Sequence, residues 1–151
     1  MQRTLDFLKL HKEVAFATVG EGNLPKIRVF QIMKQEGTTL YFATSPKKAV
    51  YQELQVNPNI ELLASANKVS VRCTGMADFN VDDDTKRWIY EHNDVLPRLY
   101  EHYDQLAYFS MHISEMDYYD LNPTPPVMKH YDRCVLKKSS PAFFSRFDRL
   151  P

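Results

Sequence analysis

The chain has 151 residues, with 19 basic and 19 acidic side chains that give a formal net charge of zero. A chain of this size is expected to form one domain that buries roughly 68–70% of its unfolded surface without a metal or disulfide. The lack of a basic excess argues against non-specific nucleic-acid binding, and no apolar run reaches the length of a membrane span. We therefore expect a soluble, cytoplasmic protein with reduced cysteines and with neither nucleic-acid nor membrane partners.

The N-terminal third is predicted to form one helix and three strands. A short amphipathic helix is expected over residues 4–12, with Thr4 as a candidate cap. Runs of β-branched and aromatic residues predict strands at 14–19, 25–34 and 39–44, separated by turns that contain glycine. These three strands are predicted to pair in sequence as a meander.

The next segment joins a strand to a helix and carries two lysines. A helix is predicted over residues 49–56, with Ser45 as its N-cap and with Lys47 and Lys48 in the first turn. Cations at that position oppose the helix dipole. A bound phosphate held by the lysines and by the hydroxyls of Thr44 and Ser45 would account for them, and an exposed lysine pair on the surface is the alternative.

Two further strands are predicted at 59–66 and 69–79. The second alternates with a period of two, which places Cys73 on the core face as an inert buried thiol. Gly75 interrupts this pattern and indicates a bulge or a close approach of another backbone or of a ligand.

The remaining chain is predicted to close the sheet and then leave it. An acidic start predicts a helix over 82–92, followed by a second helical piece broken at Pro97. Closing strands are expected at 106–113 and 116–121. Residues from 122 onward are rich in proline and basic residues, and their aromatic side chains suggest an arm that packs on a second subunit.

These elements predict a mainly β fold with peripheral helices, in the form of a small antiparallel barrel. The chain has neither a repeated βαβ pattern nor a GxGxxG motif, which argues against a Rossmann domain. A zinc site built on His92 and His102 is not supported, because their spacing of ten residues across Pro97 matches no common zinc motif.

Four sequence pieces occur in a fixed order: residues 24–33 (LPKIRVFQIM), 40–49 (LYFATSPKKA), 57–58 (NP) and 70–77 (SVRCTGMA). Together they resemble the FMN-binding split barrel of the pyridoxamine 5'-phosphate oxidase-like family. The resemblance implies a split-barrel domain over residues 1–121 and a C-terminal arm over residues 122–151 that packs on the barrel or on the partner subunit. It also implies a homodimer with the flavin in the subunit cleft.

The resemblance implies an FMN site that two copies of the chain share. Arg28 and the two lysines would bind the phosphate with help from the two hydroxyls, and three consecutive strand residues would lie along the isoalloxazine ring. A serine or an arginine of the fifth strand would reach the flavin of the other protomer. The implied cofactor-binding residues are Arg28, Val29, Phe30, Gln31, Thr44, Ser45, Lys47, Lys48, Ser70 and Arg72.

Two of these assignments have alternatives. Arg28 is as well explained as an exposed strand residue, and an ion pair with Glu61 or Asp78 is the favoured interpretation of Arg72. The C-terminal region lacks the Arg-x-His motif of the vitamin-processing oxidases, so pyridoxamine phosphate is not the expected substrate.

The expected function is that of an FMN-dependent oxidoreductase, which would use a nicotinamide donor to reduce a small molecule such as a nitro compound or quinone. The alternative is a binding module without turnover that carries flavin, a deazaflavin or haem for storage, sensing or detoxification. No catalytic residue is assigned from the sequence.

Overall fold

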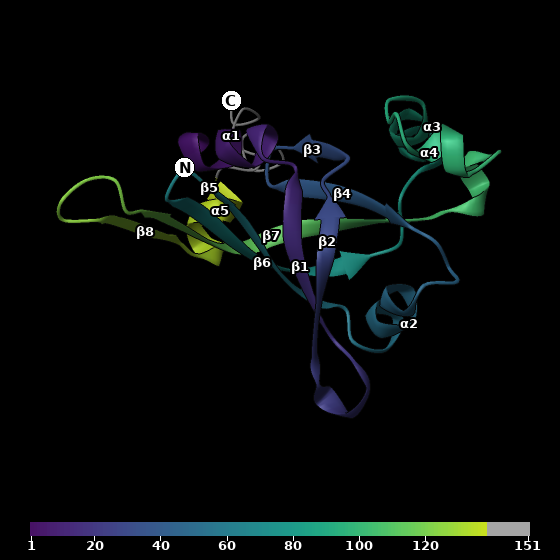
Figure 1. The fold of residues 1–151 in the computed structure, drawn as a ribbon, viewed down its shortest axis with the longest axis horizontal. Helices are drawn as coiled ribbons and strands as arrows, with labels where there is room; N and C mark the ends of the chain where they lie inside the picture. Colours follow the sequence, from purple (N-terminus) through teal and green to yellow (C-terminus); the bar gives the residue numbers. More distant parts are fainter. Residues whose placement is uncertain (139–151) are drawn as a thin grey trace, which may run out of the picture.

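The structure is a computed structural model that describes residues 1–138, and a curled antiparallel sheet of eight strands organises them (Figure 1). The strands are β1 Glu13–Val19, β2 Pro25–Gln31, β3 Lys34–Glu36, β4 Thr39–Thr44, β5 Asn59–Ala66, β6 Val69–Asp78, β7 Ala107–Asp120 and β8 Val127–Tyr131. Their order in the sheet is β2-β1-β5-β6-β7-β4-β3, and β8 also pairs with β7. This is the mainly β, antiparallel architecture that the sequence predicts.

In the part of the chain that the structure describes, five short α-helices lie around the sheet (Figure 1). They are α1 Gln2–Leu10, α2 Ala49–Val56, α3 Asp83–Glu91, α4 Leu96–Leu99 and α5 Arg133–Lys138. Within residues 1–138, no helix has the length and apolar character needed to cross a membrane. The bounds of α2 and β5 match the sequence prediction, because each is bounded by local proline or turn signals.

The predicted strand over residues 25–34 is wrong, because the structure divides it into β2 and β3. The Ile32 N–H donates to the Lys12 carbonyl at 2.8 Å, whereas the Met33 N–H donates to the Tyr41 carbonyl at 2.9 Å. Between these two consecutive residues, the backbone therefore stops pairing alongside β1 and begins to pair with β4. The predicted pairing of consecutive strands is confirmed for β1 with β2 and for β3 with β4. The two pairs do not form one three-stranded meander, because β2 and β3 lie at opposite ends of the strand order.

The two predicted closing strands, 106–113 and 116–121, are one continuous strand, β7. A register shift between β6 and β7 lies directly beside Gly75. A Cβ atom on Gly75 would lie 2.6 Å from Met111 Cγ and 2.7 Å from the His112 carbonyl oxygen. The prediction of a bulge with a close backbone approach at this glycine is confirmed.

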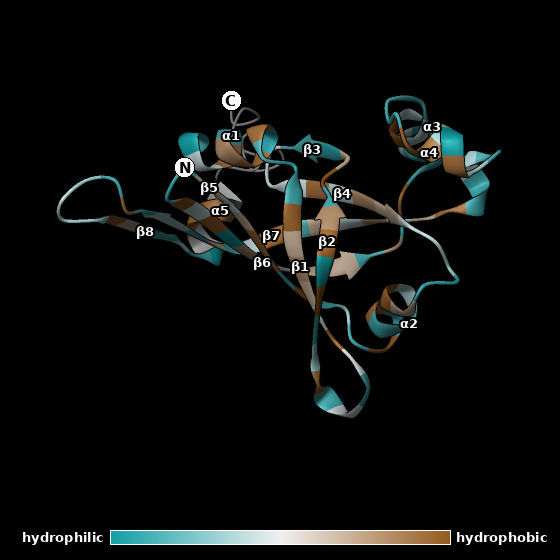
Figure 2. Cartoon of the chain, viewed as in Figure 1, coloured by the Kyte–Doolittle hydropathy of each residue, from teal (hydrophilic) through white to brown (hydrophobic). Residues whose placement is uncertain are grey.

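The main core fills the inside of the curled sheet. Phe16 of β1 and Phe42 of β4 are separated by three strands in the sheet order, yet their ring centroids are 5.3 Å apart. Phe109 of β7 stacks on Phe42 at 5.2 Å, and Leu136 of α5 is buried in the same cluster. Hydrophobic residues accordingly concentrate on the central strands, while the tip of the β1–β2 hairpin is hydrophilic (Figure 2).

A second, smaller core holds a lobe formed by α3 and α4 against the end of the sheet. Ile89 of α3 and Leu96 of α4 pack in one cluster with Ala43 of β4. The predicted acidic start of α3 is confirmed, because Asp82 caps the helix by accepting from the Thr85 N–H at 2.8 Å.

Two details of the predicted helices are wrong. Thr4 is a buried residue inside α1, and Met1 occupies the N-cap position. Pro97 lies in the first turn of α4 rather than breaking a helix there, in agreement with the tolerance of proline where no intrahelical N–H bond is lost.

The segment after β7 continues the sheet. β8 pairs with β7 and is followed by α5. The remainder of the predicted C-terminal arm, residues 139–151, lies outside the described residues.

Candidate functional site

A tight loop joins β4 to α2 and carries four of the predicted site residues. The Ser45 hydroxyl accepts from the Lys47 N–H at 3.2 Å, and the Ser45 carbonyl accepts from the Lys48 N–H at 3.0 Å. Ser45 is buried, whereas both lysines are exposed. The predicted N-cap is wrong, because Lys48 holds that position, and the lysines therefore precede the first turn of α2.

Thr44, at the end of β4, contributes an unpaired polar atom to the same loop. Its side chain is buried, and its Oγ1 has no hydrogen-bond partner among the described residues. A buried hydroxyl without a partner costs roughly 1–3 kcal/mol, so a ligand that pairs with it would recover that energy. With two exposed ammonium groups nearby in sequence and no acidic residue in the first turn of α2, the loop suits a phosphate ester.

Arg28 lies on the inner face of β2 and is bound by three protein groups. Its Nη1 donates to Thr18 Oγ1 at 2.7 Å and to the Phe16 carbonyl at 3.3 Å. Its Nη2 forms an ion pair of 2.7 Å with Glu53 Oε2 on α2. Arg28 is thus brought to the helix that follows the lysine loop, with its charge balanced by a carboxylate that the sequence analysis did not single out.

The three residues that follow Arg28 alternate between the two faces of β2. Val29 points outward and is 73% exposed. Phe30 points inward, with its ring centroid 4.7 Å from that of Phe16. The Gln31 side chain accepts at 3.1 Å from Nδ2 of Asn93, which lies between α3 and α4.

The outward side of the sheet, called here the outer face, brings predicted residues from several strands into one row. Its β2, β1 and β5 positions are apolar, and its β6, β7 and β8 positions are charged or titratable. From β2 to β8 the directly opposed residues are Val29, Ala15, Leu63, Arg72, Asp117 and His130.

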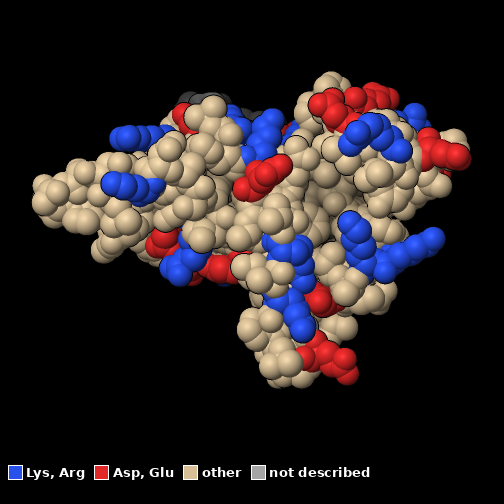
Figure 3. Space-filling view, viewed as in Figure 1, with Lys and Arg blue, Asp and Glu red and all other residues tan. Residues whose placement is uncertain are grey.

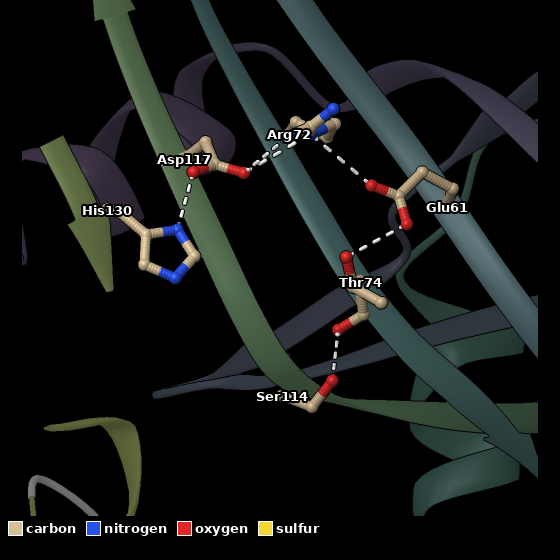
Figure 4. A network of polar contacts seen from close by, with 6 residues as sticks. All are labelled: Glu61, Arg72, Thr74, Ser114, Asp117 and His130. Atoms are coloured by element: carbon tan, nitrogen blue, oxygen red, sulfur yellow. Dashed lines mark hydrogen bonds and ion pairs between the residues drawn. The ribbon is translucent and has the colours of Figure 1, made fainter. Parts of the chain in front are cut away.

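A polar network occupies the charged half of this row (Figure 4). Arg72 Nη2 lies 2.8 Å from Asp117 Oδ2, and Arg72 Nε lies 3.4 Å from Glu61 Oε1. His130 Nδ1 lies 2.6 Å from the other oxygen of Asp117. The alternative interpretation of Arg72 as an ion-pair residue is confirmed for Glu61, with Asp117 rather than Asp78 as the second partner.

The network changes the ionisation of its members. Hydrogen bonding to Asp117 raises the pKa of His130 and that of Arg72. Burial by itself would raise the pKa of Asp117, but the hydrogen bonds from His130 and Arg72 outweigh burial, and the pKa lies below its usual value. The charged forms of all three groups are therefore favoured together.

Ser70 lies beside the network, on the rim of a shallow hollow of about 650 Å³ that Tyr119, Met128 and Lys129 also line. A larger groove of about 1120 Å³ separates the tip of the β1–β2 hairpin from α2. Lys and Arg side chains gather over β2 and beside α2, and the α3–α4 lobe carries both acidic and basic side chains (Figure 3).

The other potentially reactive side chains among the described residues do not form a reactive or metal-binding site. Cys73 is fully buried, which confirms its predicted place on the core face, and burial raises the pKa of its thiol. Among residues 1–138, no group of three His, Cys, Asp or Glu side chains is arranged to hold a metal ion.

Five residues whose polar side chains contact the predicted site residues were not predicted from the sequence: Thr18, Glu53, Asn93, Asp117 and His130. Asn93 carried a usable signal, because asparagine shortly before a helix with proline in its first turn is typical of an N-cap. The sequence gives no such signal for Glu53, Asp117 or His130, because each of them meets its partner only through the packing of separate elements.

A family model described as pyridoxamine 5'-phosphate oxidase matches residues 1–118. No curated protein matches the chain significantly in sequence.

Solved structures share the fold at low sequence identity. A Clostridium acetobutylicum protein related to general stress protein 26 of B. subtilis is 16% identical, with a TM-score of 0.74 over 89% of this chain and 95% of that one. A pyridoxamine 5'-phosphate oxidase-related, FMN-binding protein from Nostoc punctiforme is 14% identical, with a TM-score of 0.72 over 87% of both chains. A haem-binding protein from Mycobacterium smegmatis is 12% identical, with a TM-score of 0.69 over 88% of this chain and 58% of that one.

Proposed function

Because the chain belongs to the pyridoxamine 5'-phosphate oxidase-like family of FMN-binding split barrels, we propose that it binds FMN and acts as a flavin-dependent reductase of a small molecule. The bound flavin would supply two-electron chemistry, taking a hydride from a nicotinamide donor and passing two electrons to an acceptor such as a quinone or nitro compound. The chain itself would supply the binding site and its orientation.

The observation that carries this proposal is the unpaired hydroxyl of Thr44 at the start of the lysine loop. A phosphate oxygen accepts a hydrogen bond from such a hydroxyl, and the ammonium groups of Lys47 and Lys48 would balance the charge of the ester. The loop requires no backbone rearrangement to expose these amines, because both lysines are already at the surface.

Arg28 is a further expected phosphate ligand, and its contribution depends on Glu53. The guanidinium has two bonded nitrogens in the structure, one on Thr18 and one on Glu53. A phosphate that recruits Arg28 would therefore compete with the Glu53 carboxylate.

We also propose that the outer face forms the contact between two copies of the chain. Its apolar half exposes Ile27, Val29 and Leu63, and the small side chains of Ala15 and Ala17 lie between them on β1. Apolar side chains on an edge strand are costly to leave in water, so a second copy would gain stability by covering them. In such a dimer Ser70 and Arg72 are the residues expected to reach the flavin of the partner.

A second candidate function is favoured by one relative. The Mycobacterium smegmatis protein that shares this fold is described as haem-binding, so the same barrel here would be a module that carries a cofactor without turnover. Flavin and deazaflavin are the other candidate cargoes of such a module.

Titration of the purified protein with FMN and with riboflavin tests the phosphate site. The wild type is expected to bind FMN more tightly than riboflavin, and Lys47→Glu with Lys48→Glu is expected to remove that preference. The control is Lys9→Glu with Lys12→Glu, which makes the same charge change at two exposed lysines elsewhere. Equal affinity of the wild type for the two ligands would refute the phosphate site.

Anaerobic mixing of the FMN-loaded protein with NADH or NADPH distinguishes the reductase function from the carrier function. Loss of the flavin absorbance, followed by its return on addition of a quinone, supports the reductase. A loaded protein that neither donor bleaches is a carrier.

A further inference from the structure

The side chain of Asn93 has a fixed orientation. Its Oδ1 accepts from the Val95 N–H at 3.0 Å and from the Leu96 N–H at 3.1 Å, at the start of α4. Only the oxygen of an amide accepts hydrogen bonds, so these two donors determine which end of the side chain is oxygen. The nitrogen of Asn93 must then be the atom that faces Gln31.

This orientation determines the polarity of Gln31 in turn. Asn93 Nδ2 donates to Gln31 Oε1 at 3.1 Å, which turns the oxygen of Gln31 toward the α3–α4 lobe. The Nε2 group of Gln31 is then the free end, and it makes no side-chain hydrogen bond within residues 1–138. Gln31 is half-buried at the end of β2 and shares the outer face with Val29, so it presents a hydrogen-bond donor rather than an acceptor.

We propose that Asn93 is a positioning residue that holds Gln31 as a hydrogen-bond donor toward the edge of the bound flavin ring. The proposal rests on the proposed function, because Gln31 is one of the residues expected along the ring. An oxidised isoalloxazine ring carries carbonyl and imine acceptors along its polar edge, and a fixed donor matches them. A fixed donor also loses less conformational entropy on binding than a freely rotating amide does.

The substitution Asn93→Asp tests this positioning of Gln31 with little change in side-chain shape. One carboxylate oxygen still accepts from the N–H groups of Val95 and Leu96, and aspartate accepts from such N–H groups at a helix start as well as asparagine does. The other oxygen can only accept, so Gln31 must rotate to donate to it and must present its own oxygen to the ligand. We expect riboflavin affinity to fall by about tenfold, because an acceptor would then face the acceptors of the ring.

Riboflavin is the probe because it lacks the phosphate, so the added negative charge acts on the ring contact alone. Asn80→Asp adds the same charge at an exposed position and is expected to leave riboflavin affinity unchanged. Asn93→Ser keeps a hydroxyl that can cap the helix and removes the amide that donates to Gln31, so it is expected to cause a smaller loss of riboflavin affinity. This variant serves as the test if the aspartate variant does not fold. Riboflavin affinity equal to that of the wild type in both position-93 variants would overturn the proposal.

A measurement without ligand separates this proposal from the proposed function. In amide-resolved NMR spectra of the free protein, the Gln31 side-chain NH₂ is expected to exchange rapidly with water in the wild type and to become protected in Asn93→Asp. A protected Gln31 NH₂ in the wild type would overturn the proposal that Asn93 leaves this group free as a donor. A protein with the expected exchange pattern that binds no flavin would instead refute the proposed function.

Discussion

Arg28 and Glu53 form an ion pair of 2.7 Å that joins β2 to α2, and the Thr18 hydroxyl donates to the same carboxylate oxygen at 2.5 Å. The three side chains close a small polar cluster between the hairpin and the helix that follows the lysine loop. The cluster stabilises the attachment of α2, and it also occupies the arginine that the phosphate would use. At the proposed phosphate site, Glu53 is therefore expected to lower the affinity for an anionic ligand.

Replacement of Glu53 by Gln is expected to raise FMN affinity by about tenfold while leaving riboflavin affinity unchanged. The uncharged amide no longer competes with the phosphate for Arg28, and riboflavin has no phosphate to gain from the change. Fluorescence titration with each ligand measures both constants. Glu91→Gln, which removes one exposed carboxylate on α3, is the control. An equal rise in the two variants would indicate a general charge effect and contradict a role for Arg28.

Replacement of Thr44 by Val is expected to separate stability from binding. The isosteric change removes an unpaired buried hydroxyl, so the free energy of unfolding without ligand should stay constant or rise by up to about 1 kcal/mol. FMN affinity should fall by roughly tenfold or more, because the hydroxyl is lost as a donor to the phosphate. Denaturant unfolding and FMN titration measure the two effects. A less stable protein with unchanged FMN affinity would show that the hydroxyl serves the fold.

The His130–Asp117 pair is expected to make the attachment of β8 depend on pH. The pKa of His130 is raised in the folded protein, so its stabilisation is complete below the unfolded pKa of about 6.5 and is lost as pH rises through the folded value. The pKa of Asp117 is lowered, so its stabilisation is present above about pH 4 and is lost as pH falls through the folded value. The pair therefore contributes most between about pH 4 and 6.5.

Titration of the imidazole of His130 by NMR checks this expectation. The pKa should lie above about 6.5 in the wild type and return toward that value in Asp117→Asn, whose amide carries no charge. An unchanged pKa in that variant would assign the shift to other acidic neighbours, such as Glu115 and Asp132.

Replacement of Gly75 by Ala is expected to lower the free energy of unfolding by about 1–3 kcal/mol, because the new methyl group would overlap Met111 and the His112 carbonyl. Gly22→Ala is the comparison, since a Cβ there has a strained φ of +69° but meets no atom within 4 Å. Thermal unfolding of the two variants measures the difference. A larger loss at Gly22 would contradict the close approach at the bulge.

The sequence by itself determined the local elements and their faces. The period of two in β6 placed Cys73 in the core. Proline after Asn57 ended α2 at the predicted residue. Such signals are local, because they depend on the φ and ψ preferences and the spacing of residues that are neighbours in the chain.

Tertiary structure decided which elements meet and which side chains pair. The apolar character of the predicted strand continues through Ile32 and Met33, so the sequence does not reveal that their adjacent N–H groups bond to different strands. The charged neighbours of Arg28 and Arg72 are likewise set by the packing of α2 on the hairpin and by the register of β6 and β7. Periodicity reports which face of an element is buried, but a salt bridge depends on the distance between two elements, and only the folded sheet with its packed helices fixes that distance.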